Sequence, residues 1–251
     1  MRAMVELING WIAPVAAGPI IGSFLGVLVR RLPEGRGVAT GRSACEACGH
    51  ALGPAELVPV LSYLAQRGRC RACGAKIAPM HLYIELAATA VAISAALGVP
   101  AGPFLWVSCG LGWALLTLGW IDAGSFLLPD VITLPLLLAG LAEAFFLEPE
   151  RLTDRALAAA LAYTALWALA LAYRWLRGRD GLGLGDAKLL AAGGAWLGTA
   201  PLPYAMLAGA LLGLGWAGGM RLRGVAVSAT TRLPFGPFLA AGIWLAWLLA
   251  G

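Results

Sequence analysis

Charged side chains are scarce in this sequence. Asp, Glu, Lys and Arg make up 12% of its 251 residues, whereas about 25% is usual in soluble domains. Hydrophobic residues make up 60% of the chain, so most of it suits lipid better than water. The composition excludes an ordinary soluble domain and indicates a membrane protein.

Two sequence signals are also missing. No Gly-rich nucleotide fingerprint follows a predicted strand. No small-residue cleavage pattern separates the first apolar run from the charges of VRRLP at 29–33, although Arg2 precedes that run as in a signal peptide. The first run is therefore expected to be an uncleaved span.

Eight apolar runs follow one another along the chain. They predict an all-α polytopic membrane protein with about eight transmembrane helices and one large loop domain. The runs lie at about residues 10–29, 82–97, 104–121, 131–147, 155–176, 187–200, 203–220 and 236–250.

The basic residues orient these spans. With the N-terminus outside, 15 of the 18 Lys and Arg residues fall in three cytoplasmic loops and three fall outside, as the positive-inside rule requires. The three outer ones are Arg2, Arg151 and Arg155. The net charge of +5 is therefore attributed to loops beside anionic membrane lipid, and no nucleic-acid partner is expected.

The largest cytoplasmic loop, residues 30–81, contains four of the five cysteines. They form two Cys-x-x-Cys pairs, and two such turns can close a tetrahedron of thiolates around zinc. Two disulfides or a thiol redox pair are the alternatives, but disulfides are rare in the cytoplasm. The sequence therefore favours a structural zinc site formed by Cys45, Cys48, Cys70 and Cys73.

Three other potential ligands are expected to stay outside that site. Four thiolates complete the coordination shell of zinc, which leaves His50 and His81 as solvated or interfacial residues. Cys109 lies within a predicted span and is expected to be a small buried apolar side chain.

Acidic residues at membrane depth are costly and therefore indicate function. The candidates are Glu85, Asp122, Asp130, Glu143 and Asp186. Asp122 lies near the end of a predicted helix, where a carboxylate opposes the helix dipole and caps nothing. Asp130 is expected to cap the next helix. Glu85 is expected to face the loop domain or a substrate. Glu143 is expected either in a contact between helices or in a shallow part of its span.

Asp186 follows the alternating glycines of GLGLGD at 181–186 and begins the next predicted helix, where capping is an alternative role. Glycine allows sharp turns and close backbone approach, so an extended substrate could lie beside this turn. The topology brings Asp122 and Asp186 to the cytoplasmic ends of different helices. If they meet, the pair shares a proton and can act as the base and acid of an aspartic protease. Two alternatives remain. The same acids would form the proton relay of a transporter, or the cysteine loop would dock an assembly partner.

Seven segments of the sequence resemble the type IV prepilin peptidases, also called leader peptidases, of the GxGD type of membrane aspartic protease. These segments are GSFLGVLVRRLP (22–33), RSACEACGH (42–50), ELVPVLSYLAQRGRCRACGAKI (56–77), YIEL (83–86), IDAGSFLLPD (121–130), GLGLGDAKL (181–189) and PFGPFLAAG (234–242).

The resemblance implies a bacterial inner-membrane enzyme of pilus assembly or type II secretion. Such an enzyme cleaves the leader of type IV prepilins and pseudopilins at the cytoplasmic face, then methylates the new N-terminus with S-adenosylmethionine. The family's catalytic aspartates correspond to Asp122 and Asp186, and its motif glycines to Gly183 and Gly185. Its zinc cysteines correspond to Cys45, Cys48, Cys70 and Cys73.

The resemblance also implies a division of the chain. Residues 1–29 would form the first transmembrane helix, 30–81 the zinc loop associated with methyl transfer, and 82–251 the protease domain. Gly26 and Glu46 depart from the family pattern, which usually has Asn and Pro at these places. Both departures fall in the methyltransferase part.

Overall fold

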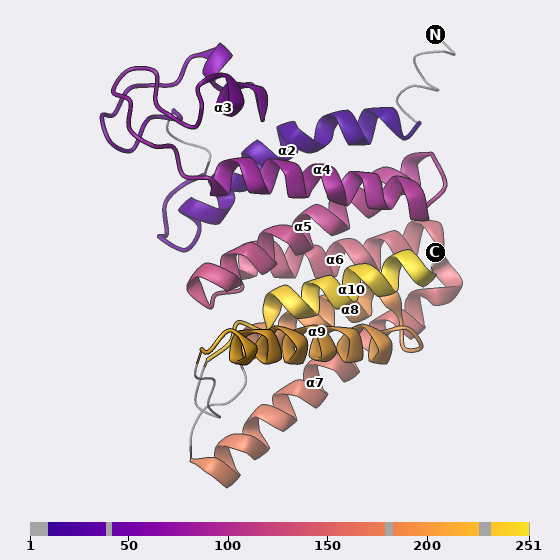
Figure 1. Cartoon of the computed structure of the whole chain (residues 1–251). Helices are drawn as coiled ribbons and strands as arrows, with labels where there is room; N and C mark the ends of the chain where they lie inside the picture. Colours follow the sequence, from indigo (N-terminus) through magenta and orange to yellow (C-terminus); the bar gives the residue numbers. More distant parts are fainter. Residues whose placement is uncertain (1–9, 39–41, 179–182, 226–231, 251) are drawn as a thin grey trace. The chain divides into compact units, whose positions relative to one another are not determined.

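The computed structural model describes residues 10–38, 42–178, 183–225 and 232–250 (Figure 1). Gly181, Arg2 and Arg179, which contributed to the predictions above, lie outside the described residues. Within these ranges the chain is helical, and its only β pairing consists of two isolated bridges, Ala44 with Ala51 and Arg69 with Lys76. The all-α prediction is confirmed.

Each predicted apolar run forms one long helix. These helices are α2 (Ile12–Arg31), α4 (Met80–Gly98), α5 (Pro103–Ser125), α6 (Asp130–Leu147), α7 (Leu152–Arg177), α8 (Leu184–Leu197), α9 (Leu202–Leu222) and α10 (Gly236–Ala250). Among the described residues, six helices are long and apolar enough to cross a membrane: α2, α4, α5, α6, α9, and α7 together with the turn before it. Helices α8 and α10, with 14 and 15 residues, are shorter than a straight span requires.

Three short helices complete the described secondary structure. They are η1 (Pro54–Glu56), α3 (Leu61–Ala65) and η2 (Pro149–Arg151). The chain divides into two compact units, Met1–Trp113 and Ala114–Gly251.

In the first unit, α2 packs closely against α4. Gly18 and Gly22 are four residues apart on α2 and therefore share a face. A Cβ atom at Gly18 would lie 2.7 Å from Cα of Thr89, and one at Gly22 would lie 2.5 Å from Cα of Glu85. Two glycines thus let the helix backbones approach, as small residues commonly do between membrane helices.

The cysteine loop of the first unit repeats one local structure twice. In the first copy the backbone N–H of Cys45 donates to the carbonyl of His50, and in the second that of Cys70 donates to the carbonyl of Ala75, both at 2.8 Å. Gly49 and Gly74 take φ angles of +73° and +72°, which glycine adopts without steric cost. The glycine after each Cys-x-x-Cys pair therefore closes a tight turn. These two turns, at residues 45–50 and 70–75, are called knuckles below.

In the second unit, α8 is the central helix. It packs against α6, α7, α9 and α10 (Figure 1), and its residues from Leu189 to Leu197 are all buried. The indole N–H of Trp196 donates to the carbonyl of Leu136 at 2.8 Å, and its ring packs edge-on against Trp247 at 5.5 Å. Because neighbouring helices cover α8 on all sides, it is apolar around its whole circumference.

Glu143 contacts a neighbouring helix, as predicted. Its carboxylate pairs with Arg155 of α7, and both side chains are only 4% exposed. Arg155 also pairs with Glu148. Buried charges of this kind are tolerated only when they are paired. The ion pairs of Arg155 therefore explain why Glu143 is buried, without a catalytic role.

Candidate active site and metal centre

Asp122 lies in the last turn of α5 and is buried, with 6% of its surface exposed. Its carboxylate Oδ2 accepts a hydrogen bond of 2.9 Å from the backbone N–H of Gly236, the first residue of α10. The N-terminus of a helix carries partial positive charge and favours an anion. The start of α10 therefore offsets the unfavourable position of Asp122 at the end of its own helix.

The structure leaves no room for a side chain at Gly236. A Cβ atom there would lie 2.7 Å from Oδ2 of Asp122 and 2.9 Å from its Cγ. The role of Gly236 beside Asp122 was not predicted from the sequence. The signal was a glycine between two prolines at the start of a span, but its partner is 114 residues away.

Asp186 lies in the first turn of α8, with 9% of its surface exposed. The backbone of Gly183, the N-cap residue, hydrogen-bonds to the Asp186 carboxylate. Gly185 is needed for close packing, because a Cβ atom there would lie 3.1 Å from Cβ of Leu128. Asp186 is the third residue of α8 and is not its N-cap residue, which is Gly183.

The structure brings Asp122 and Asp186 together. Asp122, at the end of α5, lies against the first residue of α10, and α10 packs against α8, whose first turn contains Asp186, so the charge of Asp122 acts on Asp186. Two buried carboxylates that repel each other favour a state that holds one proton between them. Such a pair can supply one group that accepts a proton and one that donates it.

Asp130 does not cap a helix, so that prediction was wrong. Pro129 is the N-cap of α6, and Asp130 is the first helical residue. Both carboxylate oxygens of Asp130 bind the Lys188 ammonium, at 2.7 and 2.8 Å. The pair connects the first residue of α6 to the fifth residue of α8. Lys188 lies two residues after Asp186.

The four loop cysteines meet at one point of the first unit. Their Sγ atoms all lie within 4.8 Å of one another, and those of Cys45 and Cys73 are 3.9 Å apart. Zinc–sulfur bonds of about 2.3 Å in a tetrahedron place sulfur atoms about 3.8 Å apart. All four cysteines are free thiols, so the disulfide alternative is not realised. The cluster has the composition and size to hold a metal ion.

The thiols also show why a cation suits this cluster. Backbone N–H groups of Cys48 and Ala47 lower the pKa of the Cys45 thiol to about 6. At Cys73 the backbone N–H of Ala75 acts in the same direction, but the neighbouring thiols, Cys48 foremost, raise the pKa to about 12. Four thiolates so close together therefore need a positive ion to neutralise their repulsion.

The three remaining candidates stay outside the cluster, as predicted. His50 lies 3.4 Å from the carboxylate of Glu56, and His81 contributes to the wall of a neighbouring cavity. Cys109 is fully buried. Glu85 faces the loop, since its Oε2 accepts a hydrogen bond of 2.7 Å from the backbone N–H of Val60.

Comparison with known proteins identifies the family. The bacterial peptidase A24 N-terminal domain matches residues 16–99, and the type IV leader peptidase family matches residues 109–218. The chain belongs to the type IV leader peptidase family. No solved structure is significantly similar to it.

Similar proteins cover most of the chain. A prepilin leader peptidase/N-methyltransferase of Burkholderia pseudomallei is 42% identical over 91% of this chain and 82% of its own length. Proteins of the same name from Aeromonas hydrophila and Pseudomonas aeruginosa are 36% and 35% identical, over 91% and 93% of this chain and 87% and 88% of their own lengths. These similarities favour the protease hypothesis over the transporter and docking alternatives.

Proposed function

We propose that this chain is a membrane aspartic endopeptidase that cleaves the leader of type IV prepilins and pseudopilins and then N-methylates the new N-terminus. The observation that carries the proposal is the pair of buried carboxylates, Asp122 and Asp186, at two helix starts. The relatives named as prepilin leader peptidase/N-methyltransferase supply the substrate class and the second activity.

In the proposed cleavage, one carboxylate of the pair removes a proton from a water molecule, whose oxygen attacks the scissile carbonyl. The other, protonated carboxyl group donates its proton to the carbonyl oxygen. Collapse of the tetrahedral intermediate breaks the C–N bond, and a proton passes to the leaving amine. The backbone N–H of Gly236 and the start of α8 hold the two acids in place while protons move between them.

We assign zinc to the four-cysteine cluster. The set of thiolates and their spacing suit tetrahedral zinc, and the closed set of four ligands is typical of a structural site. Cys45, Cys48, Cys70 and Cys73 would hold the ion, which would fix the two knuckles relative to each other. S-adenosylmethionine would supply the methyl group for the new N-terminal amine.

We place the enzyme in the bacterial inner membrane, with the N-terminus outside and the active site at the cytoplasmic face. The distribution of Lys and Arg supports this orientation. In the same topology, the last turn of α5 and the first turn of α8 face the cytoplasm, where a basic leader would arrive. The protease would lie within residues 82–251, and residues 30–81 would serve methyl transfer.

Mass analysis of a processed substrate tests both activities. The detergent-purified protein is incubated with a synthetic prepilin segment, with and without S-adenosylmethionine. The proposal predicts loss of the leader in both samples and a further gain of one methyl group at the mature N-terminus in the second. An intact substrate would refute the peptidase, and a cleaved but unmethylated product would refute the methyltransferase alone.

A further inference from the structure

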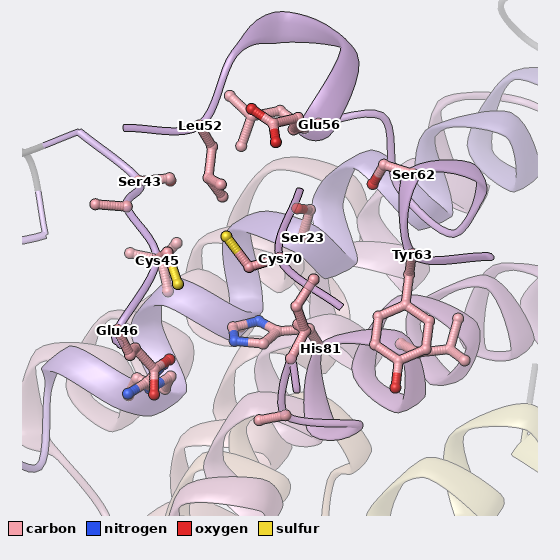
Figure 2. Close-up of a pocket in the computed structure, with 18 of the residues that line it drawn as sticks. Ser23, Ser43, Cys45, Glu46, Leu52, Glu56, Ser62, Tyr63, Cys70 and His81 are labelled. Carbon is pink, nitrogen blue, oxygen red and sulfur yellow. The ribbon is translucent and has the colours of Figure 1, made fainter. Parts of the chain in front are cut away.

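A cavity of about 650 Å³ lies beside the cysteine cluster in the first unit (Figure 2). Its volume is in the range of pockets that bind small molecules of nucleoside size. The walls come from α2, the two knuckles, α3 and the start of α4. Cys45 and Cys70 line it, together with His81 and Glu56, which lies at the top of the view in Figure 2.

Glu56 has a buried oxygen without a partner. Its side chain is 10% exposed, and its Oε2 accepts a hydrogen bond of 2.9 Å from the backbone N–H of Gly53. The other oxygen, Oε1, is buried and has no hydrogen-bond partner. The cavity therefore offers an acceptor that a bound ligand with a donor would satisfy.

This acceptor belongs to an ionised group. The backbone N–H of Gly53 is the main cause that lowers the pKa of the Glu56 carboxyl, and His50 and Arg71 act in the same direction. An ionised carboxylate can only accept hydrogen bonds. The complementary ligand group is therefore a hydroxyl or an N–H donor, and not a second acceptor.

The backbone beside Glu56 is held in a strained form. Val60 has a φ angle of +61° and a ψ angle of −55°, and the N–H of Leu61 donates to the carbonyl of Pro59 at 2.6 Å. This is the rare γ-turn with positive φ, which costs a β-branched residue free energy. Glu85, itself buried, holds the turn through the N–H of Val60. Strain of this kind persists where surrounding contacts impose it, and it is concentrated at binding sites.

The charges of the cavity differ between its parts. Cys45 and Cys70 present sulfur, and four thiolates around one Zn²⁺ would keep a net charge of −2, which attracts a cation. Arg42 also lines the cavity and would attract a carboxylate. Arg30 and Arg36 also line the cavity, but they are already paired with Glu46 and Glu34. A ligand with a positive centre, a carboxylate and hydroxyl donors would match all three features.

We propose that this cavity is the binding site of the methyl donor, a sulfonium nucleoside of the S-adenosylmethionine class, and that Glu56 Oε1 accepts hydrogen bonds from its ribose hydroxyls. The inference rests on the proposed methyl transfer. In that step the bond from the methyl carbon to sulfur breaks and its electron pair stays on sulfur, which becomes a thioether. The lone pair of the substrate amine forms the new C–N bond, and the surplus proton of the amine passes to water.

Direct binding tests the assignment without methyl transfer. Equilibrium dialysis with radiolabelled S-adenosylmethionine is performed on the zinc-loaded, detergent-purified wild type, on Glu56→Gln and on Glu150→Gln. Glu150 is exposed in η2 of the second unit, so its variant is a matched loss of one carboxylate. We expect Glu56→Gln to weaken binding about tenfold or more, because hydrogen bonds to charged groups are worth about 1.5–3 kcal/mol. Glu150→Gln should bind like the wild type.

Two results would overturn the assignment. One refutes only the binding site, and the other also refutes the proposed methyltransferase. Wild-type affinity in Glu56→Gln would place the methyl donor elsewhere and leave the proposed methyltransferase intact. Absence of binding to the wild type, together with an unmethylated product, would remove the methyltransferase itself. If Glu56→Gln fails to retain zinc, Ser62→Phe, which narrows the cavity from α3, replaces it, and unchanged binding in that variant also refutes the site.

Discussion

The carboxylate of Asp122 accepts a hydrogen bond from the backbone N–H of Gly236, which lies 114 residues further along the chain. This contact fixes the acid at the end of α5 by means of the start of α10. It also explains a glycine that carries no chemistry of its own, since any side chain at position 236 would overlap the carboxylate. The catalytic assignment of Asp122 therefore makes a second residue essential to its position.

Gly236→Ala should lose cleavage. The new methyl group would push the Asp122 carboxylate away, and a displacement of about 1 Å can reduce the rate about 100-fold. Gly215→Ala is the control, because a Cβ atom on this residue of α9 would meet nothing within 4 Å and should leave the activity unchanged. Initial rates of prepilin cleavage compare the two. Equal rates in both variants would contradict the role given to Gly236.

The ion pair between Asp130 and Lys188 should position α8. The pair is partly exposed, so we expect Lys188→Asp to cost only about 0.2–1 kcal/mol of stability through loss of the attraction, and more through the new repulsion. Its main effect should be a lower cleavage rate, because Lys188 is two residues after Asp186. The double variant Asp130→Lys with Lys188→Asp restores opposite charges and should recover activity. A double variant no more active than the single one would show that the pair has no positioning role.

One zinc ion per chain is expected, and it should depend on the knuckles. Cys73→Ala removes one of four ligands and should reduce the zinc content measured by elemental analysis. Cys109→Ala removes a buried thiol outside the cluster and should retain zinc. Zinc in the Cys73 variant at the level of the wild type, or none in the wild type, would exclude the proposed metal centre.

The indole of Trp196 should stabilise the second unit. Trp196→Phe removes the hydrogen bond from the indole N–H to the carbonyl of Leu136, which is worth about 0.5–1.5 kcal/mol. Trp167→Phe is the matched control, since Trp167 is 47% exposed. Thermal unfolding in detergent should show a lower midpoint for the first variant only. The same midpoint in both would mean that lipid or detergent contacts outweigh this hydrogen bond.

The sequence predicted the features that local patterns determine. Long apolar runs placed all eight helices, and the two Cys-x-x-Cys-Gly motifs predicted a four-thiol cluster because each knuckle is closed by bonds within a few residues. Glu143 was correctly expected in a contact between helices. In each case the deciding interactions are local or follow from hydrophobicity alone.

Features that depend on distant partners could not be predicted in the same way. Asp130 was expected to cap a helix, but its carboxylate binds Lys188, 58 residues away. The contact between Gly236 and Asp122 and the cavity beside Glu56 likewise arise from packing that no local pattern encodes. The sequence could identify the two catalytic candidates, but not the groups that hold them.

Conversion of either acid to its amide tests the central claim most directly. Asp122→Asn and Asp186→Asn are purified in detergent and compared with Asp154→Asn, which removes a carboxylate that binds Thr199 instead. Cleavage of a synthetic prepilin is measured by mass analysis, and thermal unfolding confirms that each variant is folded. We predict no detectable cleavage by either active-site variant and normal cleavage by the control. Full activity in a folded Asp122→Asn or Asp186→Asn protein would contradict the claim.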